Sequence, residues 1–205
     1  MKIIGITGIS GSGKTLVTKI LAKLGGFAVE TDPMTHALMK KGQPAHSEIT
    51  AAFGTDILDE NGEILRKALG DIVFSDSKKL KQLESIIHPK VAAKTAELIS
   101  QAQKTGNYKF AIIDAPLLIE AGMHKNCHTC WLITANHETR LARIIARDNI
   151  TQESAQKRLD SRPGDITLRS HADIIIENNC NDIKALTIKV KNALHSSFDY
   201  FNTTY

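Results

Sequence analysis

The feature that most restricts how this chain can fold is the run GISGSGKT at residues 8–15, which matches the pattern G-x-x-x-x-G-K-[ST]. An apolar run at residues 3–7 precedes it, and residues 14–24 follow with leucine and isoleucine at helical spacing. This order is typical of a phosphate-binding loop (P-loop), because glycine lets successive N–H groups turn inward at the positive end of a helix. We therefore predict a P-loop at residues 8–15, with an accidental glycine-rich turn as the alternative.

Short apolar runs predict the strands of a parallel sheet. They cover residues 3–7, 27–29, 110–115 and 131–134, with a fifth at 173–177. Each run is nearly continuous rather than alternating, as in strands that are covered on both faces, and longer helical patterns lie between them. We therefore expect an α/β fold of the P-loop nucleotide-hydrolase type, with a five-stranded parallel sheet flanked by helices.

The segment from residue 31 to residue 109 differs from the rest of the chain. Helical patterns broken by glycine and proline follow one another there, with no convincing strand. We predict a single domain in which residues 1–30 and 110–205 form the nucleotide-binding core and residues 31–109 form a helical insertion.

Two helices are expected after the fourth strand, at residues 138–148 and 151–161, with Thr151 as the N-cap of the second. Together they would form a lid of about residues 138–165. A last helix is expected to begin after Asn181 or Asp182, since either side chain can cap it.

The composition indicates a folded protein that binds a small anionic ligand rather than a nucleic acid or a membrane. The 205 residues are 42% hydrophobic and 23% charged, as in ordinary globular chains. A net charge of +4 and 5% aromatic residues give no basic surface on which bases stack. No apolar run approaches the ~18–20 residues needed to cross a bilayer, and no signal-peptide pattern opens the chain. We therefore expect a cytoplasmic protein.

The three cysteines predict no complete disulfide framework, because their number is odd. Cys127 and Cys130 form a C-x-x-C beside His124, and a zinc site completed by Cys180 is one interpretation. The other is a small buried cysteine at the start of the fourth strand, which we favour because no second metal-binding pair follows.

The end of the P-loop predicts how a nucleotide and its metal ion are held. Lys14 would contact the β- and γ-phosphates, and the Thr15 hydroxyl would ligate the Mg²⁺ that bridges them. Asp114, at the end of the third strand, is the candidate second carboxylate and would hold Mg²⁺ through water. The alternative for Asp114 is a cap of the following turn beside Pro116.

Asp32 follows the second strand, and the carboxyl ends of parallel strands face the ligand crevice of such a sheet. A carboxylate there can accept the proton of an attacking hydroxyl, which is the base or positioning role in phosphoryl transfer. The alternative is an N-cap, because Asp32 precedes Pro33, a favoured first residue of a helix.

Arg140, Arg143 and Arg147 recur three and four residues apart, on one side of the first lid helix. Forked guanidinium donors suit phosphate oxygens, and a lid that closes excludes water from the transfer. The alternative is that all three are solvated surface arginines.

The chain resembles the dephospho-coenzyme A kinase family over nearly its whole length. The matching residues are Gly5-Ile6-Thr7-Gly8, Gly11-Ser12-Gly13-Lys14-Thr15, Asp32, Phe53-Gly54, His88-Pro89, Ala115-Pro116-Leu117-Leu118-Ile119-Glu120, Arg143, Arg147-Asp148, Ala172-Asp173 and Asn178. The run from Ala115 to Glu120 is the most specific of them.

The resemblance implies an Mg²⁺-dependent kinase that transfers phosphate from ATP to the ribose 3′-hydroxyl of 3′-dephospho-CoA, with the helical insertion binding the coenzyme A moiety. It implies catalytic roles for Asp32, Lys14 and Arg143. The ATP contacts it implies are Gly8, Gly11, Ser12, Gly13, Lys14, Thr15, Leu16 and Arg147. The acceptor contacts it implies are Thr7, Asp32, His88, Pro116, Leu117 and Leu118. From the sequence alone, His88 before Pro89 is equally a helix-end residue.

The chain departs from the family pattern at three places. Glu30-Thr31-Asp32 stands where Asp-Ala-Asp is usual, Arg162 stands where a lid glutamine is common, and Ile9-Ser10 replaces Gly-Ile in the P-loop. Two other functions are also compatible with a P-loop. One is that of another small-molecule kinase, such as a nucleoside or nucleotide kinase. The other is that of a nucleotide-dependent switch, although the chain has no Asn-Lys-x-Asp guanine motif.

Overall fold

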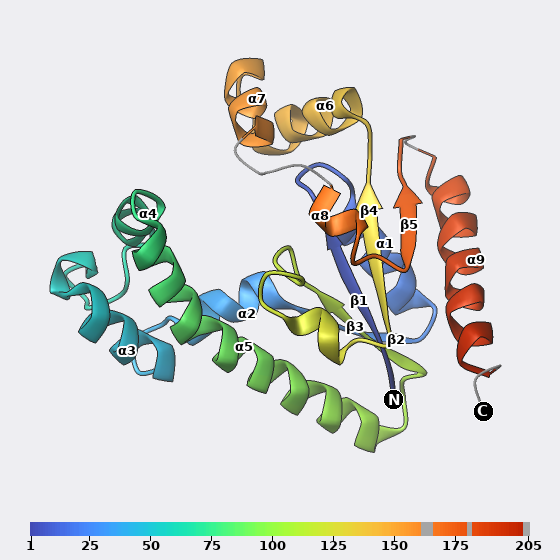
Figure 1. Cartoon of the computed structure of the whole chain (residues 1–205), viewed down its shortest axis with the longest axis horizontal. Helices are drawn as coiled ribbons and strands as arrows, with labels where there is room; N and C mark the ends of the chain where they lie inside the picture. The colour runs from blue at the N-terminus through green and yellow to red at the C-terminus, as the bar shows by residue number, and fades with distance from the viewer. Residues whose placement is uncertain (161–165, 180–181, 203–205) are drawn as a thin grey trace. The chain divides into compact units, whose positions relative to one another are not determined.

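The computed structural model describes residues 1–160, 166–179 and 182–202 of the chain (Figure 1). The chain forms two compact units. The first consists of Met1–Val29 with Ala102–Tyr205, and the second is Glu30–Gln101. The P-loop belongs to the first unit and Asp32 to the second.

A five-stranded parallel sheet forms the centre of the first unit, as predicted. Its strands are β1 (Lys2–Gly8), β2 (Gly26–Glu30), β3 (Phe110–Asp114), β4 (Thr129–Thr134) and β5 (Ile174–Glu177), in the order β2-β3-β1-β4-β5. β1 lies between β3 and β4, with Ile4 opposite both Ile112 and Thr129. The P-loop therefore begins at the carboxyl end of the central strand.

Both faces of the three inner strands are buried, which explains their continuous apolar sequences. All residues of β3 and β4 are buried, as are the last five of β1. On one face, alternate strand residues pack against α1 (Lys14–Lys23) and α9 (Ile183–Asn202), which run alongside each other (Figure 1). Trp131 lies fully buried in this core, so one side of the P-loop helix α1 is fixed by apolar packing.

The two helices that were predicted to form a lid are α6 (His137–Asp148) and α7 (Gln152–Asp160). Thr151 caps α7 as predicted, because its Oγ1 accepts the Ser154 N–H at 3.3 Å. α6 ends at Asn149, which takes the left-handed conformation at φ 50°. The two helices are held together by a small apolar core, which is separate from that of the sheet and is centred on Ile144, Ala155 and Leu159.

Two remaining elements complete the first unit. They are η2 (Met123–Asn126), a short 3₁₀ helix, and α8 (Ile166–Arg169). Asp182 is the N-cap of α9, since its Oδ1 accepts the N–H groups of Lys184 and Ala185 at 2.8 and 3.2 Å. The other predicted cap, Asn181, lies outside the described residues, as does Arg162, which was predicted to be in the lid.

The second unit is built from helices. They are α2 (Thr31–Leu38), α3 (Pro44–Phe53), η1 (Thr55–Ile57), α4 (Arg66–Phe74) and most of α5 (Ser77–Thr105), whose last residues belong to the first unit. An isolated bridge joins Leu58 and Ile64. Among the helices described, none is long and apolar enough to cross a membrane.

Candidate active site

The P-loop links β1 to α1 through two glycines in the left-handed region of backbone conformation. Gly11 has φ 80° and Gly13 has φ 88°, values that residues with a side chain rarely adopt. Between them, the Ser12 N–H donates to the Ile9 carbonyl at 3.1 Å and closes a tight turn. The local sequence therefore dictates the loop, because only glycine allows both reversals without strain.

The loop carries polar groups suited to an anion. Within the part of the chain that the structure describes, the N–H groups of Gly11 and Gly13 meet no acceptor. The Ser12 hydroxyl is buried and also has no partner there. The buried Ser12 hydroxyl is costly without an acceptor, and the two N–H groups can donate to an anion, so a ligand with phosphate oxygens fits this loop.

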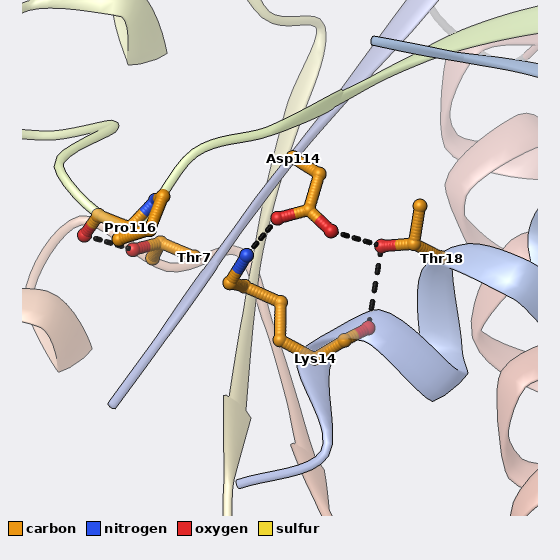
Figure 2. Close-up of polar contacts among 5 residues, drawn as sticks. All are labelled: Thr7, Lys14, Thr18, Asp114 and Pro116. Atoms are coloured by element: carbon orange, nitrogen blue, oxygen red, sulfur yellow. Dashed lines mark hydrogen bonds and ion pairs between the residues drawn. The ribbon is translucent and has the colours of Figure 1, made fainter. Parts of the chain in front are cut away.

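Asp114 lies at the end of β3, next to β1, with only 4% of its side chain exposed (Figure 2). Its Oδ1 pairs with the Lys14 ammonium, and its Oδ2 accepts the Thr18 hydroxyl at 2.7 Å. Thr18 also lies 3.2 Å from the Lys14 carbonyl. Because the hydroxyl has one hydrogen, the shorter, charge-assisted bond to the carboxylate is the favoured one. Neither of these partners belongs to the turn after Asp114.

Thr18 is a site residue that the sequence analysis missed. It stands one helical turn after Lys14 on α1, so the four-residue spacing was the available signal. Thr15 is exposed on the first turn of α1. A threonine hydroxyl and a carboxylate are both hard oxygen donors, and Mg²⁺ is usually held by few protein oxygens together with water and phosphate. The residues present therefore fit this ion.

The turn after β3 brings the predicted acceptor contacts of the first unit together. The Thr7 hydroxyl, buried at the end of β1, donates to the Pro116 carbonyl at 3.2 Å (Figure 2). Leu117 is the exposed side chain of this turn, at 39%. Leu118 is fully buried and packs where a side chain on Gly5 would otherwise lie. Of the two leucines, only Leu117 presents its side chain to solvent.

Two arginines of α6 contact the P-loop. Arg140 Nε donates to the Ser10 carbonyl at 3.1 Å, and Arg143 Nη1 lies 3.4 Å from the Gly11 carbonyl. A third side chain, Asn178 after β5, donates through Nδ2 to the Ser12 carbonyl at 2.9 Å. The sequence analysis named Asn178 only as a motif match, because its partner lies 166 residues away.

The third arginine of the series makes different contacts. Arg147 binds Asp148 with two hydrogen bonds, of 2.7 and 2.9 Å, and Arg158 of α7 contacts the same carboxylate at 2.5 Å. Hydrogen bonding and charge from Arg147, followed by Arg158, hold the pKa of Asp148 below its usual value of 3.8. These contacts tie α6 to α7.

Asp32 is exposed in the first turn of α2, and the prediction that it is an N-cap is wrong. The cap position is Glu30, without a side-chain cap bond. Pro33 fits as the third helical residue because N–H groups of a first turn have no partner within the helix.

His88 is not at a helix end either. It lies with Pro89 inside α5. A buried stripe of Ile87, Val91, Thr95 and Ile99 at four-residue spacing runs past the proline. Packing along this stripe offsets the one backbone hydrogen bond that proline removes, so the helix continues.

The two cysteines of the C-x-x-C are free thiols. A hydrogen bond with Cys130, together with burial, raises the pKa of Cys127. The Sγ atoms of Cys127 and Cys130 lie 3.5 and 3.8 Å from the carbonyls of Met123 and His124. Cys180 is outside the described residues, and within the described part of the chain no three histidine, cysteine or acidic side chains gather as a metal site.

Comparisons with known proteins point to one family. The family model of dephospho-CoA kinase matches residues 2–184. A dephospho-CoA kinase from Fusobacterium nucleatum is 41% identical over 87% of this chain and 90% of its own length. Among solved structures, a Thermus thermophilus protein is 27% identical with TM-score 0.77, covering 97% of each chain. A Campylobacter jejuni dephospho-CoA kinase is 26% identical with TM-score 0.58, covering 96% of this chain and 97% of its own.

Proposed function

The chain belongs to the dephospho-CoA kinase family, and from this premise we propose which residues carry out its reaction. The reaction transfers the γ-phosphoryl group of ATP to the ribose 3′-hydroxyl of 3′-dephospho-CoA and yields coenzyme A and ADP, the last step of coenzyme A biosynthesis. The observation that carries the proposal is the P-loop, with the N–H groups of Gly11 and Gly13 lacking acceptors in the described chain and Lys14 directly after them.

The P-loop and the first turn of α1 bind the phosphates of ATP. The N–H groups of Gly11 and Gly13 supply donors at the positive end of α1, and the buried Ser12 hydroxyl adds one more. Lys14 places its charge on the β- and γ-phosphates, where charge develops during transfer. We assign Gly8, Thr15 and Leu16 to the same ATP site.

Mg²⁺ would be held by the Thr15 hydroxyl and, through water, by Asp114. When bound, it neutralises charge on the phosphates and fixes their geometry. Asp114 already accepts from Lys14 and Thr18, so its carboxylate direction is set before any ligand arrives. The chain's own contribution is therefore an oriented hard oxygen site next to the P-loop.

The lid supplies further positive charge. Arg143 stabilises the transferred group, and Arg147 contacts ATP after leaving Asp148. Guanidinium groups suit both tasks, because their forked donors match phosphate oxygens. α6 and α7 carry these residues, and they exclude water that would otherwise hydrolyse ATP.

Asp32 acts as the base toward the acceptor. It follows the carboxyl end of β2 by two residues and is exposed to solvent. The ribose 3′-oxygen forms a bond to the γ-phosphorus, the bond from that phosphorus to the β–γ bridging oxygen breaks, and the hydroxyl proton passes to the Asp32 carboxylate. ADP then leaves with the bridging oxygen.

The acceptor contacts follow from the same family membership. They are Thr7, the turn of Pro116, Leu117 and Leu118, and His88 of α5. The exposed Leu117 offers an apolar surface to the nucleoside, and residues 31–109 bind the coenzyme A moiety. We assign the protein to the cytoplasm, where ATP is abundant and thiols such as those of Cys127 and Cys130 stay reduced.

An acceptor panel tests the proposal. With Mg-ATP, the protein is incubated separately with 3′-dephospho-CoA, nucleosides and nucleoside monophosphates, and ADP is measured in a coupled assay with coenzyme A detected by mass. We expect ADP only with 3′-dephospho-CoA, and no ADP when EDTA removes Mg²⁺. ADP formed preferentially with a nucleoside would assign a nucleoside kinase, and ATP binding without acceptor-dependent ADP would assign a nucleotide switch.

A further inference from the structure

Three successive carbonyl groups of the P-loop are held by side chains from other elements. Arg140 holds the Ser10 carbonyl and Arg143 lies on that of Gly11. Asn178 holds the Ser12 carbonyl through a buried 2.9 Å hydrogen bond. These contacts lie on the oxygens of the loop, whereas an anion binds to its N–H groups.

The planar peptide group links the two sides of the loop. In a trans peptide the C=O of one residue and the N–H of the next point in opposite directions. A donor that holds the Ser12 oxygen therefore directs the Gly13 N–H away from Asn178. In the same way, Arg140 on the Ser10 oxygen directs the Gly11 N–H away from the lid helix. Both of these N–H groups meet no acceptor within the described residues.

Close packing makes the arrangement stiff. A Cβ on Gly13 would collide with Asn178 Nδ2, and one on Gly11 would lie 2.7 Å from the Arg140 carbonyl oxygen. The loop backbone thus rests directly on both residues. A rigid support of this kind limits the rotation of each peptide group that would turn its N–H away from a phosphate.

Asn178 is itself fixed on several sides. Its side chain is 2% exposed, and its N–H donates to the Thr134 carbonyl of β4 at 2.8 Å. Its own carbonyl accepts Arg143 Nη1 at 2.9 Å. One residue therefore connects the ends of β4 and β5, the lid helix α6 and the P-loop.

We propose that Asn178 is a positioning residue for the phosphate cradle, which it keeps in a binding geometry by holding the Ser12 carbonyl, with Arg140 doing the same at Ser10. This rests on the proposed role of the P-loop in binding the phosphates of ATP. Asn178 contacts no substrate, and its effect passes through the direction of the Gly13 N–H.

Asn178→Asp tests this with the smallest change in shape. The carboxylate has no N–H to donate and faces the Ser12 carbonyl with like charge, so the peptide group turns. We expect ADP affinity, measured by titration calorimetry, and the KM for ATP to worsen by about tenfold to a hundredfold, because the change removes one hydrogen bond and adds repulsion. The KM for 3′-dephospho-CoA should stay within about twofold.

Asn179→Asp is the matched control, since it makes the same chemical change and adds the same charge one residue away. Asn179 is exposed, and its Oδ1 accepts the Asn136 N–H at 2.7 Å, which a carboxylate also does. ADP affinity should stay within about twofold. If Asn178→Asp does not fold, Asn178→Ala replaces it, because it removes the donor without adding charge. ADP affinity within about twofold of wild type in the folded Asn178 variant would overturn the proposal.

Amide NMR separates this inference from the proposed function beneath it. In the wild type, ADP should move the Gly13 amide proton downfield as the N–H bonds to phosphate, and in Asn178→Asp the movement should be smaller. No movement in the wild type would refute the phosphate cradle itself. Equal movement in both proteins would leave the cradle standing and refute the positioning role of Asn178.

Discussion

Replacement of Lys14 by methionine should destabilise the fold in the absence of any nucleotide. Asp114 is 4% exposed and Lys14 17% exposed, so the pair is largely withdrawn from water. Removing one partner of a buried ion pair costs about 3–5 kcal/mol, because the other charge is left without compensation. Water has some access to Lys14, and the Thr18 hydroxyl still bonds Asp114, so we expect the lower end, about 3 kcal/mol.

For a chain of this size a loss of about 3 kcal/mol lowers the melting temperature by roughly 6–12 °C. The assay is urea unfolding without ligand, followed by fluorescence of Trp131, which is the only tryptophan and is fully buried in the same unit. Circular dichroism checks that the folded variant keeps the helical content of the wild type.

A second variant tests whether the loss of stability comes from the uncompensated charge of Asp114. In Lys14→Met with Asp114→Asn, the buried group is neutral and nearly the same shape, so the double variant should be more stable than Lys14→Met alone by about 2 kcal/mol. Lys14→Met unfolding within about 0.5 kcal/mol of the wild type would refute the reasoning. So would a double variant less stable than the single one.

Three further predictions concern other residues. Asp32→Asn should lower kcat by about 10²–10⁴ with the KM for ATP unchanged, because it removes the base but no phosphate contact. Steady-state kinetics measures both constants, and a KM for ATP that worsens as much as kcat falls would contradict the assignment. Gly13→Ala should abolish ADP binding in titration calorimetry and lower the melting temperature, since φ 88° is strained for alanine and its Cβ meets Asn178; normal ADP affinity would contradict the loop geometry. Asp148→Asn should be less stable than the wild type at neutral pH. Because Arg147 lowers the pKa of Asp148 in the folded state, this difference should shrink only as the pH falls below about 3.8, and thermal melts across the pH range check it.

The parts of the fold that the sequence predicted are those set by local pattern. The P-loop follows from GISGSGKT between a strand and a helix, and the strands follow from apolar runs buried on both faces. Neighbouring residues decide these features, so one segment carries enough information. The cap of α7 by Thr151 is local in the same sense.

The parts that escaped prediction depend on contacts between distant segments. Thr18 joins the site through Asp114, which is 96 residues away, and Asn178 supports the P-loop across 166 residues. No spacing rule foretells such pairs, because the register of the sheet brings them together. The prediction that His88 before Pro89 ends a helix failed for a different reason. The proline is a local helix-breaking signal, but packing along the long buried stripe of α5 outweighs it.

The central place of β1 in the sheet bears on how the protein is made. Lys2–Gly8 is synthesised before the partners of this strand, Phe110–Asp114 and Thr129–Thr134, which emerge much later. Throughout that interval the P-loop lacks the neighbouring strands that fix its position, although the contiguous stretch Glu30–Gln101 has already been synthesised before β4. A nascent chain halted before residue 129 should therefore be unable to bind ATP, and competence for catalysis should arise only when β4 has emerged and paired with β1.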